Sequence, residues 1–322
     1  MQTPSEPKLK DGSPKLEWAA RSEGAKRSVF GNYRADDLES SSRRKEALTS
    51  FAGNPEGGQS LLTSAATKAG LQTSIDLALA RAFIHRFLAK AYEDPTFEAW
   101  HWLTDAQTIA LLRSATAVLG SSLSKSAEAL INALQPDALD SFHSAYLAAF
   151  GHAARGQCPL NEIEYGDLKA DLLFQPHRLA DLAAFYCAFG LEVVGDADER
   201  QDHICLELEF ACVLAAKEAY ALENQLDAEE LALCRNAQKK FLREHLGRWT
   251  PAFARRLAGT TTDAALGALA EFTRVFIESE CARFAVNPGG EDLLLRPVDE
   301  AAESMCASCG IPGLPPGALP TT

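Results

Sequence analysis

Apolar residues recur every three or four positions from about residue 74 to residue 286. The first such segment, SIDLALARAFIHRFLAKAYEDP, begins with Ser74, a residue suited to cap a helix N-terminus, and Pro95 lies beyond its end. We find no alternating strand pattern and no internal repeat. Because the connections between the predicted helices are short, neighbouring helices should pack antiparallel. The chain is therefore predicted to be all-α, a single globular bundle of about ten helices.

Glycine and proline set the ends of the predicted helices. Gly151 and Gly190 are placed to terminate two of them, and Pro176 marks a break or a fresh start between them. The segment 151–167 is predicted to be a loop. The helices after the first are expected near residues 95–104, 106–119, 124–134, 136–150, 168–189, 198–224, 227–246, 250–258 and 262–286.

Composition divides the chain into three parts. Residues 1–72 are rich in Ser, Gly, Pro, Lys and Glu and have little apolar periodicity, which is typical of a disordered extension. Residues 73–287 carry the helical pattern and form the predicted all-helical domain. Residues 288–322 are predicted to be a loop-like tail, which contains a Cys-x-x-Cys pair.

The charge of the chain argues against a nucleic-acid partner. The formal net charge is -13, and residues 76–322 hold 20 basic and 35 acidic residues, so the acidity lies in the helical part. A nucleic-acid-binding protein would show a basic face. No stretch approaches the ~20 consecutive apolar residues of a membrane-spanning helix, and the N-terminal segment lacks the apolar core of a secretory signal. With most cysteines scattered singly in apolar patterns, we expect a cytoplasmic protein without membrane insertion.

One short segment, ERQDHICLELEF, combines a half-buried helical pattern with four acidic residues and a histidine. Glu199, His203 and Glu207 are spaced i, i+4, i+8 and should share one helix face, with Asp202 nearby. Carboxylates beside a histidine favour its charged form, which predicts a raised pKa for His203. A partly exposed helix face with ordinary ion pairs explains the same pattern without any binding role.

No enzyme signature accompanies this segment. A helical di-iron site needs paired Glu-x-x-His motifs on two helices and two further glutamates, and the chain lacks that set. The His-Glu-x-x-His motif, the glycine-rich phosphate loop and the Gly-x-Ser-x-Gly elbow are also missing. The sequence therefore predicts a non-enzymatic protein without a cofactor of its own.

A second group of polar residues, CPLNEIEYGD, lies in the predicted loop ahead of a helix. Tyr165 in this loop could stack on a bound peptide while its hydroxyl finds a polar partner. The alternative is an ordinary connecting loop whose tyrosine packs on the core.

The two segments, and the helix between them, occur in an order that resembles a known family. The order is Pro-x-x-Glu-x-x-Tyr, then LADLAAFYCAFGLEV, then Asp-His-Ile-x-x-Glu-Leu-x-Phe. It is similar to that of the TorD-like family of cytoplasmic chaperones for molybdoenzymes that are exported by the twin-arginine route. The close resemblance covers residues 159–210. The matching residues are Glu162, Tyr165, Phe185, Tyr186, Phe189, Gly190, Asp202, His203, Ile204, Glu207, Leu208 and Phe210.

The resemblance implies a binding protein. Members of this family bind the signal peptide, and some also the body, of a molybdenum-containing oxidoreductase, and they hold it back from export until its cofactor is inserted. A homodimer is compatible with the resemblance. The residues that it implies in client binding are Glu162, Tyr165, Phe189, Asp202, His203 and Glu207.

Each of these residues has an expected role. Asp202 and Glu207 are expected to bind the arginines of the peptide, because arginine pairs with carboxylates through two hydrogen bonds. His203 is expected to position the site. Tyr165 and Phe189 are expected to line a groove for the apolar part of the peptide.

Two other functions compete with the chaperone hypothesis. Cys306 and Cys309 could bind a metal or cycle a disulfide, with Cys158 and His152 as further ligands if the tail folds back, whereas Cys281 is expected to lie in the core. Two free thiols in an unstructured tail explain the same pair. The chain could also be a helical scaffold that binds no peptide.

Overall fold

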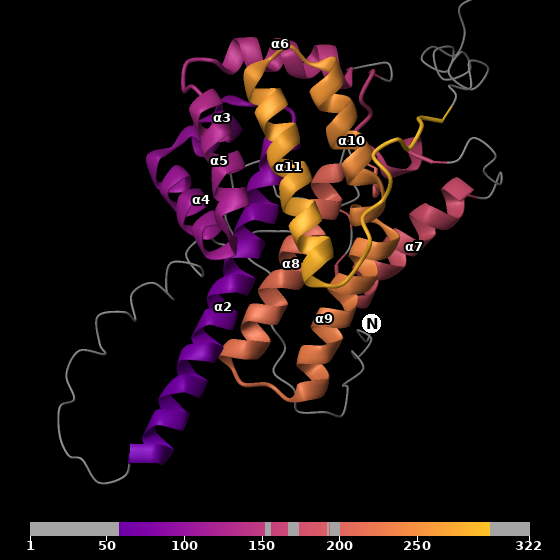
Figure 1. Cartoon of the computed structure of the whole chain (residues 1–322). Helices are drawn as coiled ribbons and strands as arrows, with labels where there is room; N and C mark the ends of the chain where they lie inside the picture. Colours follow the sequence, from indigo (N-terminus) through magenta and orange to yellow (C-terminus); the bar gives the residue numbers. More distant parts are fainter. Residues whose placement is uncertain (1–57, 152–155, 167–173, 192, 194–199, 297–322) are drawn as a thin grey trace, which may run out of the picture.

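Ten α-helices make up most of the part of the chain that the structure describes. In this computed structural model the described residues are 58–151, 156–166, 174–191, 193 and 200–296 (Figure 1). Among them there is no strand, only two isolated antiparallel bridges, and the prediction of an all-α fold is confirmed. The elements are α2 (Gly58–Tyr92), α3 (Phe97–Thr104), α4 (Ala106–Leu119), α5 (Ser121–Ala133), α6 (Leu139–Phe150), the 3-10 helix η2 (Glu162–Glu164), α7 (Phe174–Ala188), α8 (Ile204–Glu223), α9 (Ala228–Glu244), α10 (Leu246–Thr260) and α11 (Ala264–Arg283).

Helix ends follow the local chemistry of the sequence. Asp105, Asp227 and Asp263 precede α4, α9 and α11, and their carboxylates accept hydrogen bonds from backbone N–H groups of the first turn. Gly151 and Gly190, predicted as helix ends, follow α6 and α7 with φ of 82° and 74°. This left-handed conformation favours glycine, and it confirms both predicted ends.

The first helix begins earlier than predicted. Ser74, expected as its N-cap, lies inside α2, and its hydroxyl donates a hydrogen bond to the carbonyl oxygen of Gly70 at 3.0 Å. A serine inside a helix can satisfy its hydroxyl in this way, so serine alone does not mark a helix start. No proline interrupts residues 58–92, and the helix continues through polar turns. The predicted extension 1–72 therefore overlaps α2, and its first 57 residues lie outside the described part.

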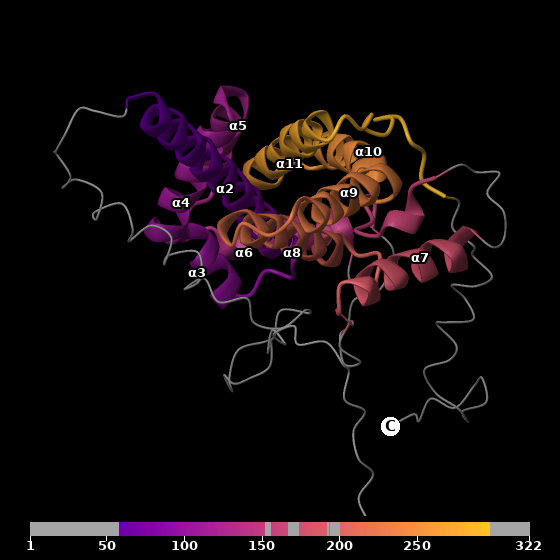
Figure 2. The same ribbon diagram turned by 90° about the horizontal axis from the view of Figure 1, so that it is seen from below.

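The helices pack around α2 and α8, which lie side by side, while the N-terminal turns of α2 extend beyond the bundle (Figure 1). On one side, α4 packs against α2, and α5 packs against α4 and α11. On the other side, α9 contacts α8, while α10 lies between α9 and α11. Figure 2 shows α7 at the edge of the bundle. Within the described residues, every helix is too short or too polar to cross a lipid bilayer.

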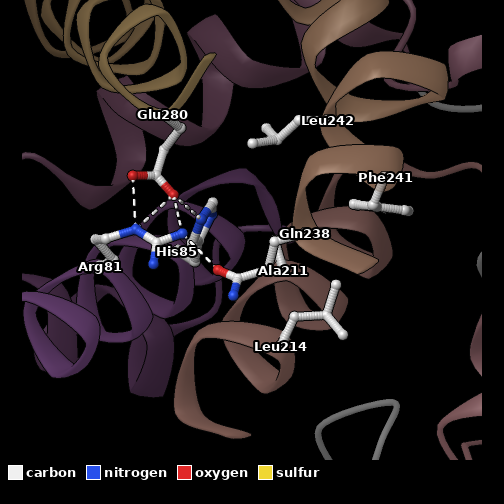
Figure 3. Close-up of a pocket in the computed structure, with 8 residues that line it drawn as sticks. All are labelled: Arg81, His85, Ala211, Leu214, Gln238, Phe241, Leu242 and Glu280. Atoms are coloured by element: carbon white, nitrogen blue, oxygen red, sulfur yellow. Dashed lines mark hydrogen bonds and ion pairs between the residues drawn. The ribbon is translucent and has the colours of Figure 1, made fainter. Parts of the chain in front are cut away.

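A buried ionic cluster joins four of these helices (Figure 3). Arg81 of α2 donates hydrogen bonds from Nε to both carboxylate oxygens of Glu280 in α11, at 2.7 and 2.8 Å, and from Nη1 to Glu218 in α8 at 2.9 Å. Its Nη2 reaches Gln238 of α9. Arg81, Gln238 and Glu280, together with His85, border a cavity of about 10 Å³, room for about one water molecule. The cluster therefore ties helices together and leaves no space for a larger ligand.

Candidate functional site

Three segments that are far apart in the sequence meet beside the start of α8. They are the motif loop (residues 158–166), the turn before α8 (residues 200–204) and the C-terminal strap (residues 286–296). Antiparallel bridges pair Asn161 with His203, and Tyr165 with Leu295. The motif loop is thus held by backbone hydrogen bonds from both other segments.

Asp202 fixes the motif loop from inside. Its side chain is 0% exposed, and it accepts hydrogen bonds from the backbone N–H of Ile163 at 3.1 Å and from the amide of Asn161 at 3.2 Å. The guanidinium of Arg200, 42% exposed, binds the same carboxylate at 2.5 Å. The sequence segment that carries the Asp-His pair therefore shapes the loop that carries the Glu-x-x-Tyr pair.

Glu162 is the centre of a second, buried set of ionic contacts. Its Oε2 lies 2.9 Å from Nδ1 of His245, and its Oε1 accepts hydrogen bonds from Arg248 at 2.9 and 3.1 Å. Arg178 of α7 lies 3.7 Å away. Burial would raise the pKa of Glu162, but the hydrogen bond and charge of His245 and the charges of both arginines outweigh burial and lower it. Glu162 is therefore ionised at neutral pH.

His245 connects this set to α7. Its Nδ1 contacts Glu162, and its Nε2 contacts Asp181 at 3.1 Å. Arg178 adds a second link, because it donates a hydrogen bond to the carbonyl oxygen of Glu244. The His245 ring is 0% exposed, whereas Asp181 is 44% exposed. His245 therefore links the buried carboxylate of Glu162 to the partly exposed carboxylate of Asp181.

Glu207 has the opposite protonation preference. It is fully buried on the first turn of α8 and accepts hydrogen bonds from the indole N–H of Trp249 at 3.1 and 3.2 Å. Burial, followed by the nearby charge of Glu162, raises the pKa of Glu207 well above its ordinary value. The pKa values of Glu162 and Glu207, two of the buried carboxylates of the site, are therefore shifted in opposite directions.

His203 departs from two predictions. It does not lie on a helix face with Glu199, because α8 begins at Ile204 and His203 is its N-cap, accepting a hydrogen bond from the N–H of Cys205 at 3.3 Å. Glu199 lies outside the described residues. The predicted rise in pKa is also wrong: burial and the charge of Arg200 lower the pKa of His203 to about 4. Desolvation outweighs any attraction from the neighbouring Asp202, which is already paired with Arg200.

The aromatic residues of the predicted site differ in exposure. Tyr165 is fully buried, donates a hydrogen bond to the carbonyl oxygen of Pro159 at 2.8 Å, and has its ring 5.2 Å from that of Trp249. Phe189, by contrast, is partly exposed and packs against Phe210 at 5.7 Å. Tyr165 therefore holds the loop to the core, and Phe189 contributes to the surface.

The structure brings all six predicted site residues into one region, and adds partners that sequence reasoning missed. His245, Arg248 and Trp249 come from the segment EHLGRWT at the start of α10, and Arg178 and Asp181 come from α7. The sequence signal that could have indicated these partners is the close spacing of His245, Arg248 and Trp249 in an acidic chain.

The alternative of a metal site at Cys306 and Cys309 concerns residues on both sides of the described boundary. Among the described residues, no group of His, Cys, Asp or Glu is arranged to hold a metal ion. Cys158 is buried, with its pKa raised by burial to about 12, and Cys281 lies in the core as predicted. Cys306, Cys309 and His152 lie outside the described residues.

Comparisons with known proteins agree with the motif order. The sequence model of the nitrate reductase delta subunit family matches residues 117–255, which include the motif loop and the starts of α8 and α10. The selenate reductase assembly chaperone protein of Thauera selenatis is 34% identical over 140 residues, which cover 42% of this chain and 69% of the relative.

Two further relatives carry similar names. The chlorate reductase assembly chaperone protein of Ideonella dechloratans is 39% identical over 101 residues, 30% of this chain and 51% of that protein. The chaperone protein TorD of Vibrio cholerae is 31% identical over 94 residues, 29% of this chain and 40% of TorD. The match thus spans between two fifths and about two thirds of the length of these relatives. This chain belongs to the TorD-like family.

Proposed function

We propose that this protein is a non-catalytic chaperone that binds a subunit of a molybdenum-containing oxidoreductase and its twin-arginine signal peptide in the cytoplasm, before export. The observation that carries the proposal is its kinship with proteins named as assembly chaperones of selenate and chlorate reductases. Those names give no support to the alternative of a metal or redox protein based on Cys306 and Cys309.

The charge of the molecule supports a basic client. A twin-arginine peptide carries two guanidinium groups next to an apolar stretch, and guanidinium pairs well with carboxylates. Around the motif loop, Glu164 and Asp181 have side chains that are 20% and 44% exposed. Phe189 adds partly exposed apolar surface. We assign the arginines to the two carboxylates and the apolar stretch to the surface near Phe189.

In this proposal, the six residues predicted for client binding have two kinds of role: one contacts the client at the surface, and five shape the motif loop from inside the protein. Phe189 contacts the client. Tyr165, His203 and the three buried carboxylates hold the motif loop in the shape that the client meets, because each is at most 5% exposed and already has partners inside the protein. The buried carboxylates are Glu162, Asp202 and Glu207.

Calorimetric titration with a panel of twin-arginine signal peptides tests the proposal. At least one peptide should bind, and replacing its Arg-Arg pair by Ala-Ala should weaken binding at least tenfold. Glu164→Gln should weaken binding about threefold to tenfold, the range expected for a charged pair near a surface.

Glu229→Gln is the matched control. Glu229 is exposed in the first turn of α9, and the length of that helix, at ~1.5 Å per residue, separates it from His245 by roughly 24 Å. Its substitution should leave binding unchanged. If no peptide binds, and if a co-expressed molybdenum reductase matures equally well without this chain, the proposal fails.

A further inference from the structure

The C-terminal strap returns from the end of α11 to the motif loop. Val286, buried, donates a backbone hydrogen bond to Cys281 at 2.8 Å, and Gly289 donates one to Gly247 at 2.9 Å. Beyond these two anchors the strap makes a turn at Glu291 and Asp292, in which the N–H of Leu293 donates a hydrogen bond to the carbonyl oxygen of Gly290 at 3.3 Å, and it then reaches the loop at Leu295. The end of the strap therefore lies on the family motif.

The strap and the loop pair through their backbones. The N–H of Gly166 donates to the carbonyl oxygen of Leu294 at 3.1 Å, and the N–H of Arg296 donates to the carbonyl oxygen of Glu164 at 2.9 Å. These two hydrogen bonds flank the antiparallel bridge between Tyr165 and Leu295. Backbone pairing of this kind does not depend on side chains, so another extended peptide can make the same bonds.

The last four residues of the strap, which follow two acidic residues, are three leucines and an arginine. Leu293 and Leu295 are partly buried and pack against the core, whereas Leu294 between them is 56% exposed. Arg296 follows directly. The end of the strap therefore has one arginine next to an apolar run, and in this limited respect it resembles a twin-arginine peptide, which combines two arginines with an apolar stretch.

We propose that the backbone edge of the motif loop, at Glu164 and Gly166, is the docking edge for an extended segment of the client, and that the C-terminal strap occupies this edge in cis until the client displaces it. This inference rests on the proposed function and adds the docking mode and its regulation. If the strap covers the edge in some of the molecules, the apparent affinity for the client is the intrinsic affinity multiplied by the fraction of molecules in which the edge is free. Releasing the strap should therefore tighten client binding. A strap that is closed for nine tenths of the time would give about a tenfold effect.

Two adjacent glycines, Gly289 and Gly290, offer a substitution that should release the strap and a matched control. A Cβ on Gly289 would lie 1.7 Å from the carbonyl oxygen of Arg248, which is backbone and cannot move aside, so Gly289→Ala should lift the strap. A Cβ on Gly290 would first meet the carboxylate end of Asp292, a flexible side chain, at 2.7 Å. Gly290→Ala should therefore leave the strap in place.

A second pair acts on the strap without touching α10. Leu295→Ser removes a side chain that packs on the core, and Leu294→Ser changes the exposed neighbour. The first should loosen the strap and the second should not. Agreement between the two pairs would exclude an indirect effect through Arg248.

Binding in trans tests the docking edge independently of the client. A synthetic peptide of residues 287–296, NPGGEDLLLR, should bind the full-length Gly289→Ala and Leu295→Ser proteins at least tenfold more tightly than the unaltered chain and the two controls. Equal binding, or none, to the released and unaltered proteins would overturn the inference, whatever the twin-arginine panel shows.

Hydrogen exchange tests the displacement itself. When the twin-arginine peptide that binds most tightly in the panel is added to the unaltered protein, the amide of Arg296 should exchange faster, because it loses Glu164. The amide of Gly166 should stay protected, because the peptide replaces Leu294. Protection of both amides with full peptide binding, or equal affinity of the released and unaltered proteins for that peptide, would overturn the inference and leave the proposed function standing. Binding of NPGGEDLLLR without binding of any twin-arginine peptide would remove the proposed function, and with it the client's place on the edge.

Discussion

At the scale of single residues, two of the three buried carboxylates of the site have pKa values shifted in opposite directions. His245 and two arginines lower the pKa of Glu162, whereas burial and the charge of Glu162 raise the pKa of Glu207. Glu162→Gln would leave those cations without their shared counter-ion, and we expect it to lower the free energy of unfolding by about 3–5 kcal/mol. Glu207→Gln keeps an acceptor for Trp249 and should change stability by less than about 1 kcal/mol at about pH 4, where the carboxyl of Glu207 holds its proton in the folded protein and largely does so in the unfolded chain.

Urea unfolding of both variants across pH checks this pair. Because the folded-state pKa of Glu207 is raised, the folded protein binds the extra proton above pH 4.5, and the unaltered chain loses stability as pH rises toward that folded-state value. Glu207→Gln removes this loss, so its stability relative to the unaltered chain should rise with pH. If Glu162→Gln and Glu207→Gln were less stable than the unaltered chain by the same amount at neutral pH, both carboxylates would be ionised in the folded protein.

The lowered pKa of His203 predicts that the protein loses stability as the pH falls below 6.5. Its pKa is about 4 in the folded protein, against 6.5 for an ordinary histidine, so the unfolded chain binds more protons between these values. Its contribution is complete above pH 6.5 and falls by about 3 kcal/mol as the pH decreases to 4. His203→Asn retains a capping side chain but cannot titrate.

The difference in unfolding free energy between His203→Asn and the unaltered chain, measured by urea titration from pH 7.5 to 4, should therefore grow as the pH falls. Parallel pH profiles for the two proteins would mean that His203 has the same pKa in the folded and unfolded states, as an exposed histidine would.

The sequence predicted which residues gather at the site but not their state. The spacing of Asp202, His203 and Glu207 was sufficient to identify the region, because the motif is local. Burial and pKa depend on groups that lie far away in the chain, such as His245, which is 83 residues from Glu162. A carboxylate beside His203 in sequence raises its pKa only if that carboxylate is not already paired, and Asp202 is paired with Arg200.

At the scale of elements, helix ends were predictable where one residue decides the backbone conformation. Gly151 and Gly190 are such positions, since both adopt positive φ. The start of α2 was not predictable from Ser74, and the start of α8 lies later than residue 198 because Asp202 and His203 pair with the motif loop instead of entering the helix. Tertiary hydrogen bonds thus override a pattern that reads as continuous helix.

Two glycines of α10 give a prediction at this scale. A Cβ on Gly247 would lie 2.5 Å from the carbonyl oxygen of Leu242 and 2.8 Å from the sulfur of Cys281, whereas a Cβ on Gly259 meets nothing within 4 Å. We expect Gly247→Ala to destabilise the protein by about 1–3 kcal/mol through overpacking. Gly259→Ala should stabilise it by roughly 0.5–1 kcal/mol through helix propensity.

Thermal and urea unfolding of these two variants compare the same substitution in the same helix. Since Gly247 borders the strap as well as α11, its alanine variant should also speed amide exchange at Gly289, which donates to the Gly247 carbonyl. Stabilisation by both substitutions would show that α10 and α11 can move apart at no cost.

At the scale of the whole molecule, the site depends on helices outside the family match. The matched residues 117–255 contain neither α2 nor α11, yet Arg81 of α2 binds both Glu280 of α11 and Glu218 of α8 inside the bundle. The strap, which also lies outside the match, continues directly from α11. The region that resembles the relatives is therefore held in shape by parts of the chain that the motif does not include.

The net charge of the whole molecule leads to a prediction about the rate at which a client binds. With 20 basic and 35 acidic residues in positions 76–322, the long-range field should attract a twin-arginine peptide, and salt should weaken this attraction because the screening length falls from about 10 Å at 0.1 M to about 3 Å at 1 M. We expect the association rate constant, measured by stopped-flow fluorescence, to fall about tenfold between 20 mM and 500 mM salt. The dissociation rate should change less than about threefold, because apolar burial and backbone pairing are screened little. The Ala-Ala peptide should associate slowly at every salt concentration, and an equally steep salt dependence for that peptide would assign the attraction to charges other than the arginine pair.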